Sequence, residues 1–278
     1  MEDDLRSIAV VTTCNERGYL DYGRMMMASF DEFVPTDIPL HIYYEGFFPD
    51  LASNRFIKRD LNASCPDLVA FKQRNKDNPR AHGHIRPKHI IKIHWSKPRI
   101  KVRRVEDDQA FRWDAVRFSH KVFAFCHAAA VCKTDMLFWM DADIILRSKI
   151  NNILFYDSLP DNCLVSFLKR HQHSECSFIG FNLRHPQISR FLDTLREYYT
   201  TDSLFKEREY HDSYLFDIAR RRFERAGCLT HDIAQGVGLD SRPGHVFENS
   251  VLGAYMEHLK GRRKALIAPI TAVPQVEG

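Results

Sequence analysis

The N-terminal region of the chain alternates between short β-branched runs and a helical pattern. Residues 8–13 read IAVVTT, which is typical of a buried strand, and residues 40–46 (LHIYYEG) form a second strand pattern. Between them, residues 23–33 (GRMMMASFDEF) place apolar side chains at helical spacing. A strand, a helix and a second strand in this order predict an α/β fold, in which helices flank a mostly parallel central sheet.

The rest of the chain continues this alternation without an internal repeat or a low-complexity linker. Residues 113–132 predict a long helix that leads directly into an apolar strand ending at Met140. Further strands are predicted at 163–168 and 176–182, and further helices at 187–199 and 211–226. We therefore expect a single domain over residues 1–278.

The composition is that of a globular protein, with 44% hydrophobic and 27% charged residues. No apolar run approaches the roughly 20 residues needed to cross a membrane, and the start, MEDDLRS, is too acidic for a signal peptide.

The seven cysteines include no Cys-x-x-Cys pair, and Cys126, Cys132 and Cys163 lie in apolar surroundings. Such cysteines are typical of reduced thiols, so we expect a cytoplasmic protein rather than a disulfide scaffold.

Two carboxylates interrupt an apolar run at residues 137–146 (LFWMDADIIL). Asp141 and Asp143 follow a predicted buried strand, and strand alternation places both side chains on one side with Ala142 on the other. Two neighbouring carboxylates are costly to bury together unless a cation lies between them. Oxygen ligands favour Mg²⁺ or Mn²⁺, which keep coordination positions for phosphate oxygens. The pattern predicts a divalent metal that carries a diphosphate, and a structural turn or helix cap is the alternative.

A second motif lies near the carboxyl end, where HLKGRRK spaces His258, Gly261 and Lys264 as His-x-x-Gly-x-x-Lys. Imidazole can complete a metal shell, glycine lets backbone approach a phosphate, and lysine can neutralise a departing diphosphate. The preceding residues 247–259 (FENSVLGAYMEHL) have a helical pattern, which offers an alternative. In that interpretation His258 favours the negative end of a helix and Gly261 is its C-cap.

Together, the two motifs resemble the family 8 glycosyltransferases, which have the GT-A (Rossmann-like) fold. The resemblance implies Asp141, Asp143 and His258 as ligands of Mn²⁺ (or Mg²⁺), with Lys264 on the phosphates of a sugar nucleotide. It also implies a UDP-hexose donor and retention of the anomeric configuration. The chain departs from the family where Ala and Leu follow the lysine in place of Pro and Trp, and where FIGFN replaces an Asn-Ser/Thr-Gly motif. His245 is the alternative third ligand.

Residues after the first strand are candidates for contact with the nucleotide. The resemblance places Thr12, Thr13, Asn15 and Glu16 near the base and ribose, and Tyr19 or Tyr22 could stack on a uracil. Asn15 and Glu16 are equally well explained as turn or cap residues.

Three further charged residues are candidates for the donor and acceptor sides of a site. Arg117 and Lys121 lie one helical turn apart, so they share a face and could reach the donor sugar or its phosphates. Ordinary exposed helix charge is the alternative. Asp212 begins a predicted helix, as the acceptor-side acidic residue of the family does, and an N-cap role is its alternative.

Residues 78–105 contain many Lys, Arg and His residues and no acidic residue. The prolines and the absence of a clear helical period predict an irregular excursion or a pair of edge strands. Such a surface attracts anionic groups, and the interleaved Trp95 fits a peripheral contact with a membrane. We expect no specific nucleic-acid partner, and a solvated insertion loop is the alternative.

These observations predict a metal-dependent glycosyltransferase that transfers a hexose from a nucleotide sugar to a hydroxyl of a glycan or glycolipid. Residues 1–145 would form the nucleotide-sugar-binding half, including the basic insertion 78–105. Residues 146–278 would form the acceptor-binding half and a C-terminal closing segment. A sugar-nucleotide nucleotidyltransferase and a non-catalytic nucleotide-sugar-binding protein on the same fold are the alternatives.

Overall fold

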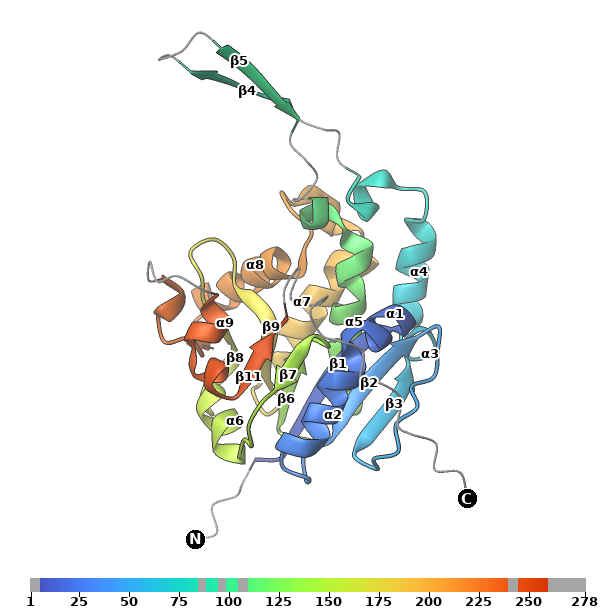
Figure 1. Cartoon of the computed structure of the whole chain (residues 1–278), viewed down its shortest axis with the longest axis vertical. Coiled ribbons are helices and arrows are strands. Elements are labelled where there is room, and N and C mark those ends of the chain that lie inside the picture. Colours follow the sequence, from blue (N-terminus) through green and yellow to red (C-terminus); the bar gives the residue numbers. More distant parts are fainter. Residues whose placement is uncertain (1–5, 85–88, 95–98, 105–109, 240–244, 260–278) are drawn as a thin grey trace.

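A computed structural model describes residues 6–84, 110–239 and 245–259, and the backbone of two further strands at 89–94 and 99–104. Strands from both ends of the chain build one central sheet, and its strand β9 is antiparallel to both neighbours while the other pairs are parallel. The predicted mostly parallel sheet is therefore confirmed. In spatial order, the seven strands are β10 (Leu229–Asp232), β8 (Cys163–Leu168), β9 (Glu175–Asn182), β6 (Met136–Met140), β1 (Ile8–Asn15), β2 (Leu40–Glu45) and β3 (Phe56–Asp60) (Figure 1).

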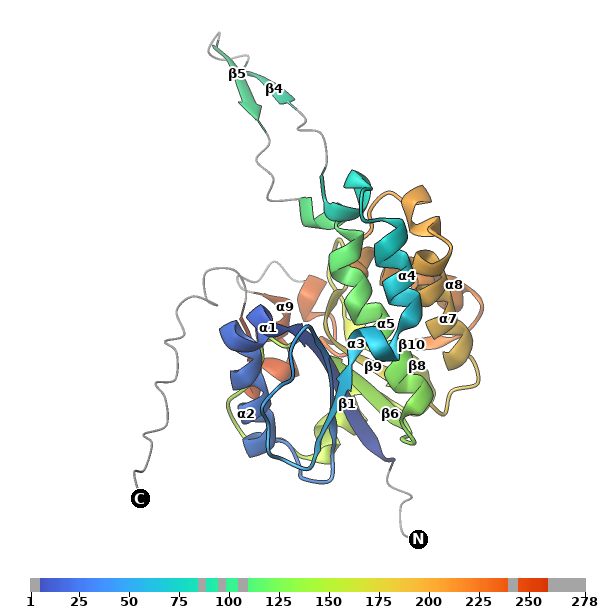
Figure 2. The same ribbon diagram turned by 90° about the vertical axis from the view of Figure 1, so that its right-hand side faces the viewer.

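Helices pack on both faces of the sheet, as predicted (Figure 2). One face is covered by α2 (Arg24–Phe33), α6 (Asn152–Ser158) and α9 (Val246–Asn249). The opposite face is covered by α4 (Pro66–Arg74), α5 (Ala115–Val131), α7 (Ile188–Thr200) and α8 (Asp212–Arg225). Two short helices, α1 (Glu16–Gly18) and α3 (Leu61–Ser64), follow β1 and β3.

Strand β6 and the first half of β1 are apolar because both of their faces are buried. In β6, Phe138 packs on the α2 side, against the ring of Phe155 with centroids 5.0 Å apart. The next residue, Trp139, packs on the α5 side, 6.2 Å from the ring of Phe125. Continuing this alternation beyond the strand puts Asp141 on the α5 side of the sheet.

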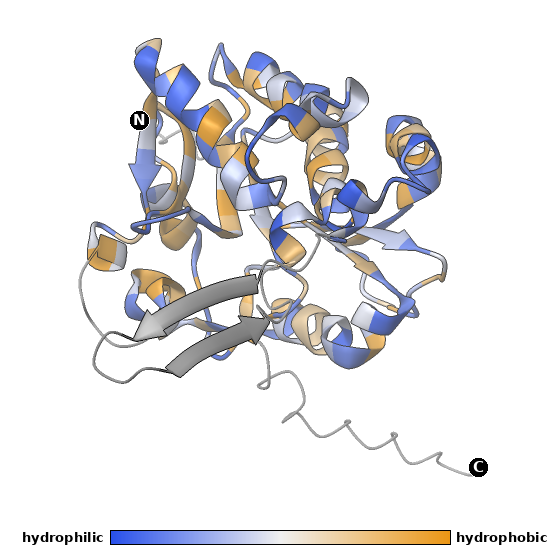
Figure 3. Ribbon diagram, turned by 90° about the horizontal axis from the view of Figure 1, so that it is seen from above, coloured by the Kyte–Doolittle hydropathy of each residue, from blue (hydrophilic) through white to orange (hydrophobic). Residues whose placement is uncertain are grey.

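Helix α5 leads into the central strand, and its sequence explains where it starts. Asp114 is the N-cap, and its side chain accepts a hydrogen bond from the backbone N–H of Arg117 (3.1 Å). The buried side of the helix includes the charged side chain of Lys121 among apolar residues. Along the helices of the structure, hydrophobic and hydrophilic positions alternate, as expected for elements with one buried face (Figure 3).

The C-terminal part of the described chain differs from the sequence expectation. The helical pattern over residues 247–259 is wrong as a prediction, because helix α9 ends at Asn249 and a single 3₁₀ turn follows it. The chain then forms strand β11 (Met256–His258), which pairs antiparallel with β7 (Ile144–Leu146). His258 therefore lies on a strand, and its interpretation as the end of a helix is also wrong.

Two other segments refine the sequence analysis. The region after β1 continues as α1 and a π-helical turn (Tyr19–Gly23) that runs into α2, so it is helical throughout. Within the basic segment, β4 (His89–His94) pairs antiparallel with β5 (Arg99–Arg104). This hairpin forms a two-stranded sheet of its own and does not extend the edge of the central sheet. Trp95 lies outside the described residues.

None of the helices in the described part of the chain is both long and apolar enough to span a membrane. The seven cysteines are all free thiols in the structure.

Candidate metal centre and its cavity

The two aspartates lie in the turn that follows β6. The backbone N–H of Asp141 donates to the carbonyl of Ser177 on β9 (2.9 Å), which keeps the turn attached to the sheet. The backbone N–H of Ile144 donates to the carbonyl of Asp141 (3.0 Å), which closes the turn before β7 begins. Because β6 is a buried central strand, these contacts hold the carboxylates at the end of a rigid element.

Strand β11 brings His258 to this turn from the far end of the sequence. His258 lies opposite Ile144 in the β7–β11 register. The next residue, Leu259, donates its backbone N–H to the carbonyl of Asp143 (2.9 Å). The position of the imidazole is therefore set by backbone pairing rather than by its side chain alone.

Asp141, Asp143 and His258 form a compact group, called the Asp–Asp–His cluster below. His258 Nε2 lies 3.1 Å from Asp143 Oδ1 and 3.9 Å from Asp141 Oδ2. One potential ligand atom of each residue lies within 4.8 Å of the others. Two carboxylates and one imidazole fit a divalent ion such as Mn²⁺, which accepts oxygen and nitrogen donors.

The second nitrogen of His258 faces another carboxylate. His258 Nδ1 is buried and lies 3.8 Å from Glu175 Oε1. That carboxylate favours the tautomer with the proton on Nδ1. In this tautomer the lone pair of Nε2 faces the two aspartates. Metal-binding histidines usually have such an acidic or carbonyl partner on their other nitrogen.

One oxygen of Asp141 is already engaged inside the protein. Asp141 Oδ1 accepts a hydrogen bond from the indole N–H of Trp139 (2.6 Å) and lies 3.2 Å from Lys121 Nζ. Its other oxygen, Oδ2, faces His258. One oxygen of Asp141 therefore contacts Trp139 and Lys121 inside the protein, and the other faces the metal-binding side of the cluster.

Lys121 is the buried partner of two carboxylates. Its Nζ lies 2.9 Å from Asp212 Oδ2 as well as 3.2 Å from Asp141 Oδ1, and it donates to the carbonyl of Cys176. Burial acts to lower the pKa of Lys121, but the charges of Asp141 and Asp212 outweigh burial and raise it, so the amine is charged. In Asp212, burial acts to raise the pKa and Lys121 outweighs it, so this carboxyl is ionised.

Negative charge gathers at the site among the described residues. Asp141 and Asp212 both contact Lys121, and Asp143 lies beside Asp141 and His258. Burial, reinforced by Asp143, raises the pKa of Asp141 despite the opposing effect of Lys121. A divalent cation between Asp141 and Asp143 would favour their ionised forms.

Behind the cluster, Glu175 contacts an arginine and a histidine. Its Oε2 lies 3.1 Å from Arg170 Nη1 and 3.0 Å from His245 Nε2. His245 is also the N-cap of α9, where its Nδ1 accepts the backbone N–H of Phe247 (3.3 Å). The structure therefore places His258 at the two aspartates, and His245 beside Glu175.

A cavity of about 880 Å³ opens beside the Asp–Asp–His cluster. Its size lies within the roughly 300–1,000 Å³ typical of small-molecule sites. Besides the cluster, Arg117 and Asp212 line it, and so do His173 and His211. Of the residues predicted from the sequence, the structure thus brings five to one cavity: Arg117, Asp141, Asp143, Asp212 and His258.

The predicted nucleotide-binding residues in β1 and just after it do not line this cavity. Thr12 is buried, and its hydroxyl has no hydrogen-bond partner among the described residues. Thr13 donates its hydroxyl to a β2 carbonyl (2.6 Å). Asn15 is the N-cap of α1, as its alternative interpretation held, while Glu16 is exposed. Tyr22 is half-buried, and burial raises its pKa.

The two predicted basic residues of α5 separate in the structure. Arg117 is exposed at the cavity, with its guanidinium 5.7 Å from the ring centroid of Phe118. Lys121 is buried behind the cavity, where it contacts Asp141 and Asp212.

Asp212 is the first residue of α8 and His211 is its N-cap, so the interpretation of Asp212 as an N-cap is wrong. Gly261 and Lys264 lie outside the described residues.

The residues that surround the cluster were not predicted from the sequence. Trp139 and Cys176 lie within apolar runs that predicted only strands, and Glu175 directly precedes one of these runs. The structure also brings together His173, Glu209 and His211, and both histidines line the cavity. The spacings His171-x-His173 and Glu209-x-His211 were visible signals, but nothing local shows that the two segments meet.

Comparisons with known proteins give limited information. No protein-family model matches the chain, and neither does any curated protein. The apo form of mouse xyloside xylosyltransferase 1 is similar in structure, with a TM-score of 0.42, 10% sequence identity, and coverage of 81% of this chain and 84% of that chain. The apo form of the glycosyltransferase GlyE from Streptococcus pneumoniae TIGR4 has a TM-score of 0.42 and 11% identity, with coverage of 82% and 46%. The chain therefore spans less than half of GlyE. At these values, function has to be argued from the site itself.

Proposed function

We propose that this chain is a metal-dependent glycosyltransferase. It would transfer a hexose from a UDP-hexose to a hydroxyl of a glycan or glycolipid acceptor, with retention of the anomeric configuration. The observation that carries the proposal is the Asp–Asp–His cluster, which lies in the turn after a central strand and opens on a cavity large enough for a small-molecule ligand. The resemblance of its two motifs to the family 8 enzymes supports the donor and the stereochemistry.

The carboxylates of the site support a metal bound together with a diphosphate. Asp141 and Asp143 can reach one ion, and Mg²⁺ and Mn²⁺ usually keep coordination positions for phosphate oxygens. When bound by Asp141, Asp143 and His258, Mn²⁺ or Mg²⁺ would supply positive charge to the leaving nucleoside diphosphate. Arg117, exposed on the cavity wall, would supply further positive charge, and so would Lys264.

Lys121 and Asp212 would position the reacting groups. Lys121 does not line the cavity, so we propose that it acts through the two carboxylates it contacts rather than on the donor. Asp212 does line the cavity, and its ionised carboxylate can accept a hydrogen bond from a sugar hydroxyl. Lys121 would fix the orientation of that carboxylate, which favours the proposed acceptor-side role of Asp212.

The two halves of the chain would contribute different parts of the reaction. Residues 1–145 would bind the nucleotide sugar, with Thr12, Thr13, Asn15, Glu16 and Tyr22 near the nucleoside. Residues 146–278 would bind the acceptor, and the segment with Gly261 and Lys264 would close over the diphosphate. The basic segment 78–105 would bring the enzyme to an anionic acceptor or membrane surface.

The decisive experiment is a donor screen with mass-spectrometric detection of products. We expect one UDP-hexose to be consumed in the presence of Mn²⁺, slowly by water and faster with a glycan or glycolipid acceptor. Activity should disappear with a chelator and return with Mn²⁺. Release of pyrophosphate from a nucleoside triphosphate and a sugar phosphate would instead indicate a nucleotidyltransferase. Donor binding without turnover across the acceptor panel would indicate a binding protein.

The stereochemical part of the proposal has a separate test. The anomeric proton of a newly formed product reports its configuration by NMR before mutarotation or hydrolysis. We expect the configuration of the donor to be kept. Inversion would contradict retention while leaving metal-dependent transfer intact.

A further inference from the structure

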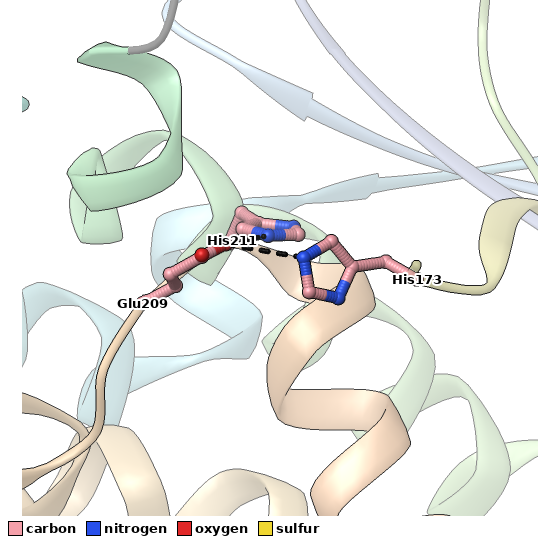
Figure 4. A group of neighbouring side chains, drawn as sticks. All are labelled: His173, Glu209 and His211. Carbon is pink, nitrogen blue, oxygen red and sulfur yellow. Dashed lines mark hydrogen bonds and ion pairs between the residues drawn. The ribbon is translucent and has the colours of Figure 1, made fainter. Parts of the chain in front are cut away.

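A second group of potential metal ligands includes two histidines that line the same cavity as the first. His173, Glu209 and His211 converge from two segments that are separate in the sequence (Figure 4). One potential ligand atom of each residue lies within 4.8 Å of the others. We call this group the His–Glu–His cluster. The proposed transferase reaction does not use it.

The distances within the His–Glu–His cluster suit a small ion. Both imidazoles direct Nε2 at the same carboxylate oxygen, since Glu209 Oε2 lies 2.9 Å from His211 Nε2 and 3.3 Å from His173 Nε2. Ligand atoms that are each about 2.0–2.1 Å from a tetrahedral ion lie about 3.3 Å from one another. The three side chains therefore need only small adjustments to share an ion.

Hydrogen bonding within the protein satisfies only part of this cluster. His211 Nε2 forms a hydrogen bond with Glu209, but the buried Nε2 of His173 has no hydrogen-bond partner among the described residues, despite its distance of 3.3 Å from the same oxygen. A buried polar nitrogen without a hydrogen bond is costly to fold. An ion between the three residues would satisfy that nitrogen.

The surroundings hold the cluster in place and keep part of it dry. The other oxygen of Glu209, Oε1, lies 3.4 Å from Arg112 Nη1, which fixes the orientation of the carboxylate. The carbonyl of Arg112 accepts backbone hydrogen bonds from Tyr210 (2.7 Å) and His211 (3.2 Å), so the loop before α8 is clamped to the turn before α5. The ring of His211 also lies 6.0 Å from that of Phe111.

The cluster has a closed side and an open side. Glu209 and His211 are buried, while His173 is partly exposed, with 17% of its side chain accessible. His173 and His211 line the same cavity as Asp212, and Glu209 lies behind them. Burial, together with the neighbouring His211, lowers the pKa of His173, which favours the neutral ring that binds metals.

We propose that His173, Glu209 and His211 bind a second divalent ion of the Zn²⁺ class, distinct from the ion of the Asp–Asp–His cluster. Two imidazoles and one carboxylate form a nitrogen-rich set, which favours Zn²⁺, Co²⁺ or Ni²⁺ over Mg²⁺ or Mn²⁺. Three protein ligands would leave a tetrahedral ion one further position, and the cavity lined by His173 and His211 would give access to it. An oxygen donor, either water or an anionic group such as a phosphate or carboxylate, would occupy it.

Cobalt substitution tests the proposal without relying on activity. The protein used in this test is a variant with Asp141→Asn and Asp143→Asn, in which the Asp–Asp–His cluster no longer competes for the ion. We expect this protein to bind Co²⁺ and to show the visible absorption of a four- or five-coordinate site. His173→Ala, at the less buried ligand, should weaken Co²⁺ binding by at least about tenfold. Loss of a residue that only hydrogen-bonds to a metal ligand already costs about that much, and His173 would be a ligand itself. His211→Ala should do the same.

His231→Ala is the matched control, since His231 is a partly buried histidine on β10 that belongs to neither cluster. It should leave Co²⁺ binding unchanged, and circular dichroism identifies any variant that has failed to fold. The proposal is overturned if the protein binds no Co²⁺, or if a folded His173→Ala variant binds it as well as its parent does. Inorganic phosphate should shift the Co²⁺ spectrum. A spectrum that is indifferent to phosphate would overturn the open coordination position.

Discussion

The two clusters of potential metal ligands in this cavity are built in different ways. The Asp–Asp–His cluster is oxygen-rich, and its residues lie on or next to paired strands whose backbone hydrogen bonds fix their positions. The His–Glu–His cluster is nitrogen-rich, and its residues come from the segment between β8 and β9 and from the segment that leads into α8. The first is joined to a buried lysine and a third aspartate, whereas the second has one arginine behind its carboxylate.

The two ligand sets would let one cavity bind two kinds of ion at separate positions. Carboxylate oxygens favour hard ions that keep sites for phosphate, and imidazole nitrogens favour ions of the Zn²⁺ class. Each cluster should therefore be removable without emptying the other.

Replacing Asp143 by Asn should abolish Mn²⁺-dependent consumption of the sugar nucleotide, because it removes a ligand oxygen at nearly constant shape. Asp141→Asn should have a milder effect, since one oxygen of Asp141 is already bound to Lys121 and Trp139. Product formation is measured by mass spectrometry, and Asp157→Asn, at an exposed position, is the control. Full activity of Asp143→Asn in the presence of a chelator would sink the metal assignment.

Replacing Lys121 by Met should lower the free energy of unfolding by about 3–5 kcal/mol, the usual cost of leaving a buried charge without its partner. Asp141 and Asp212 would both lose their cation. Urea denaturation measures the change, and Lys133→Met provides an exposed control. Mn²⁺ should restore part of the loss, because it replaces the missing positive charge at Asp141. An unchanged unfolding free energy would mean that Lys121 is not the partner of these carboxylates.

Replacing Lys264 by Ala should lower kcat by about a hundredfold, a loss typical of one electrostatic stabiliser. The lysine would meet charge that grows as the glycosidic bond breaks, so the Kd of the donor should change little. Steady-state kinetics and donor binding are measured in parallel. Addition of UDP and Mn²⁺ should also protect the segment from proteolysis. Unchanged kcat would remove the lysine from the proposed mechanism.

Replacing His258 by Ala should weaken Mn²⁺ binding by about tenfold or more, while Co²⁺ binding by the His–Glu–His cluster stays unchanged. Isothermal titration calorimetry measures both ions. His245→Ala is the comparison, because His245 also contacts Glu175 but lies away from the two aspartates. A larger loss of Mn²⁺ affinity in His245→Ala than in His258→Ala would reverse the assignment of the third ligand.

Reversing the charge of Arg99, Lys101, Arg103 and Arg104 to Glu should raise the apparent KM for the acceptor several-fold. Slow hydrolysis of the donor should not change, since neither cluster is altered. The effect should fall as salt concentration rises, because screening weakens long-range attraction. Acceptor binding that is indifferent to salt would contradict a role for this segment.

Local sequence patterns were sufficient for the main elements of the fold. The strand at residues 8–13 and the helix at 113–132 have clear periodicities, and the structure confirms both. The position of Asp141 and Asp143 after a buried strand was also readable, because the apolar run ends where the strand does. These predictions succeeded since each depends on neighbours in the sequence.

Features that depend on tertiary contacts were not readable. Residues 256–258 have a helical pattern, yet pairing with β7 outweighs that preference and makes them a strand. Lys121 was predicted as a donor contact, and only the packing of α5 against the sheet shows that it is buried. The His–Glu–His cluster needs two loops to meet, and no local pattern records that meeting.

The β7–β11 pair also decides when the site can exist during synthesis. Asp143 and His258 are 115 positions apart in the sequence (258 − 143 = 115), so an ion bound to both is a cross-link that closes a long loop. The ribosome releases both aspartates well before the histidine, and a nascent chain could hold the ion only weakly until β11 has emerged and paired. Tight metal binding would then report that translation has passed residue 258 and that the two ends of the fold have joined.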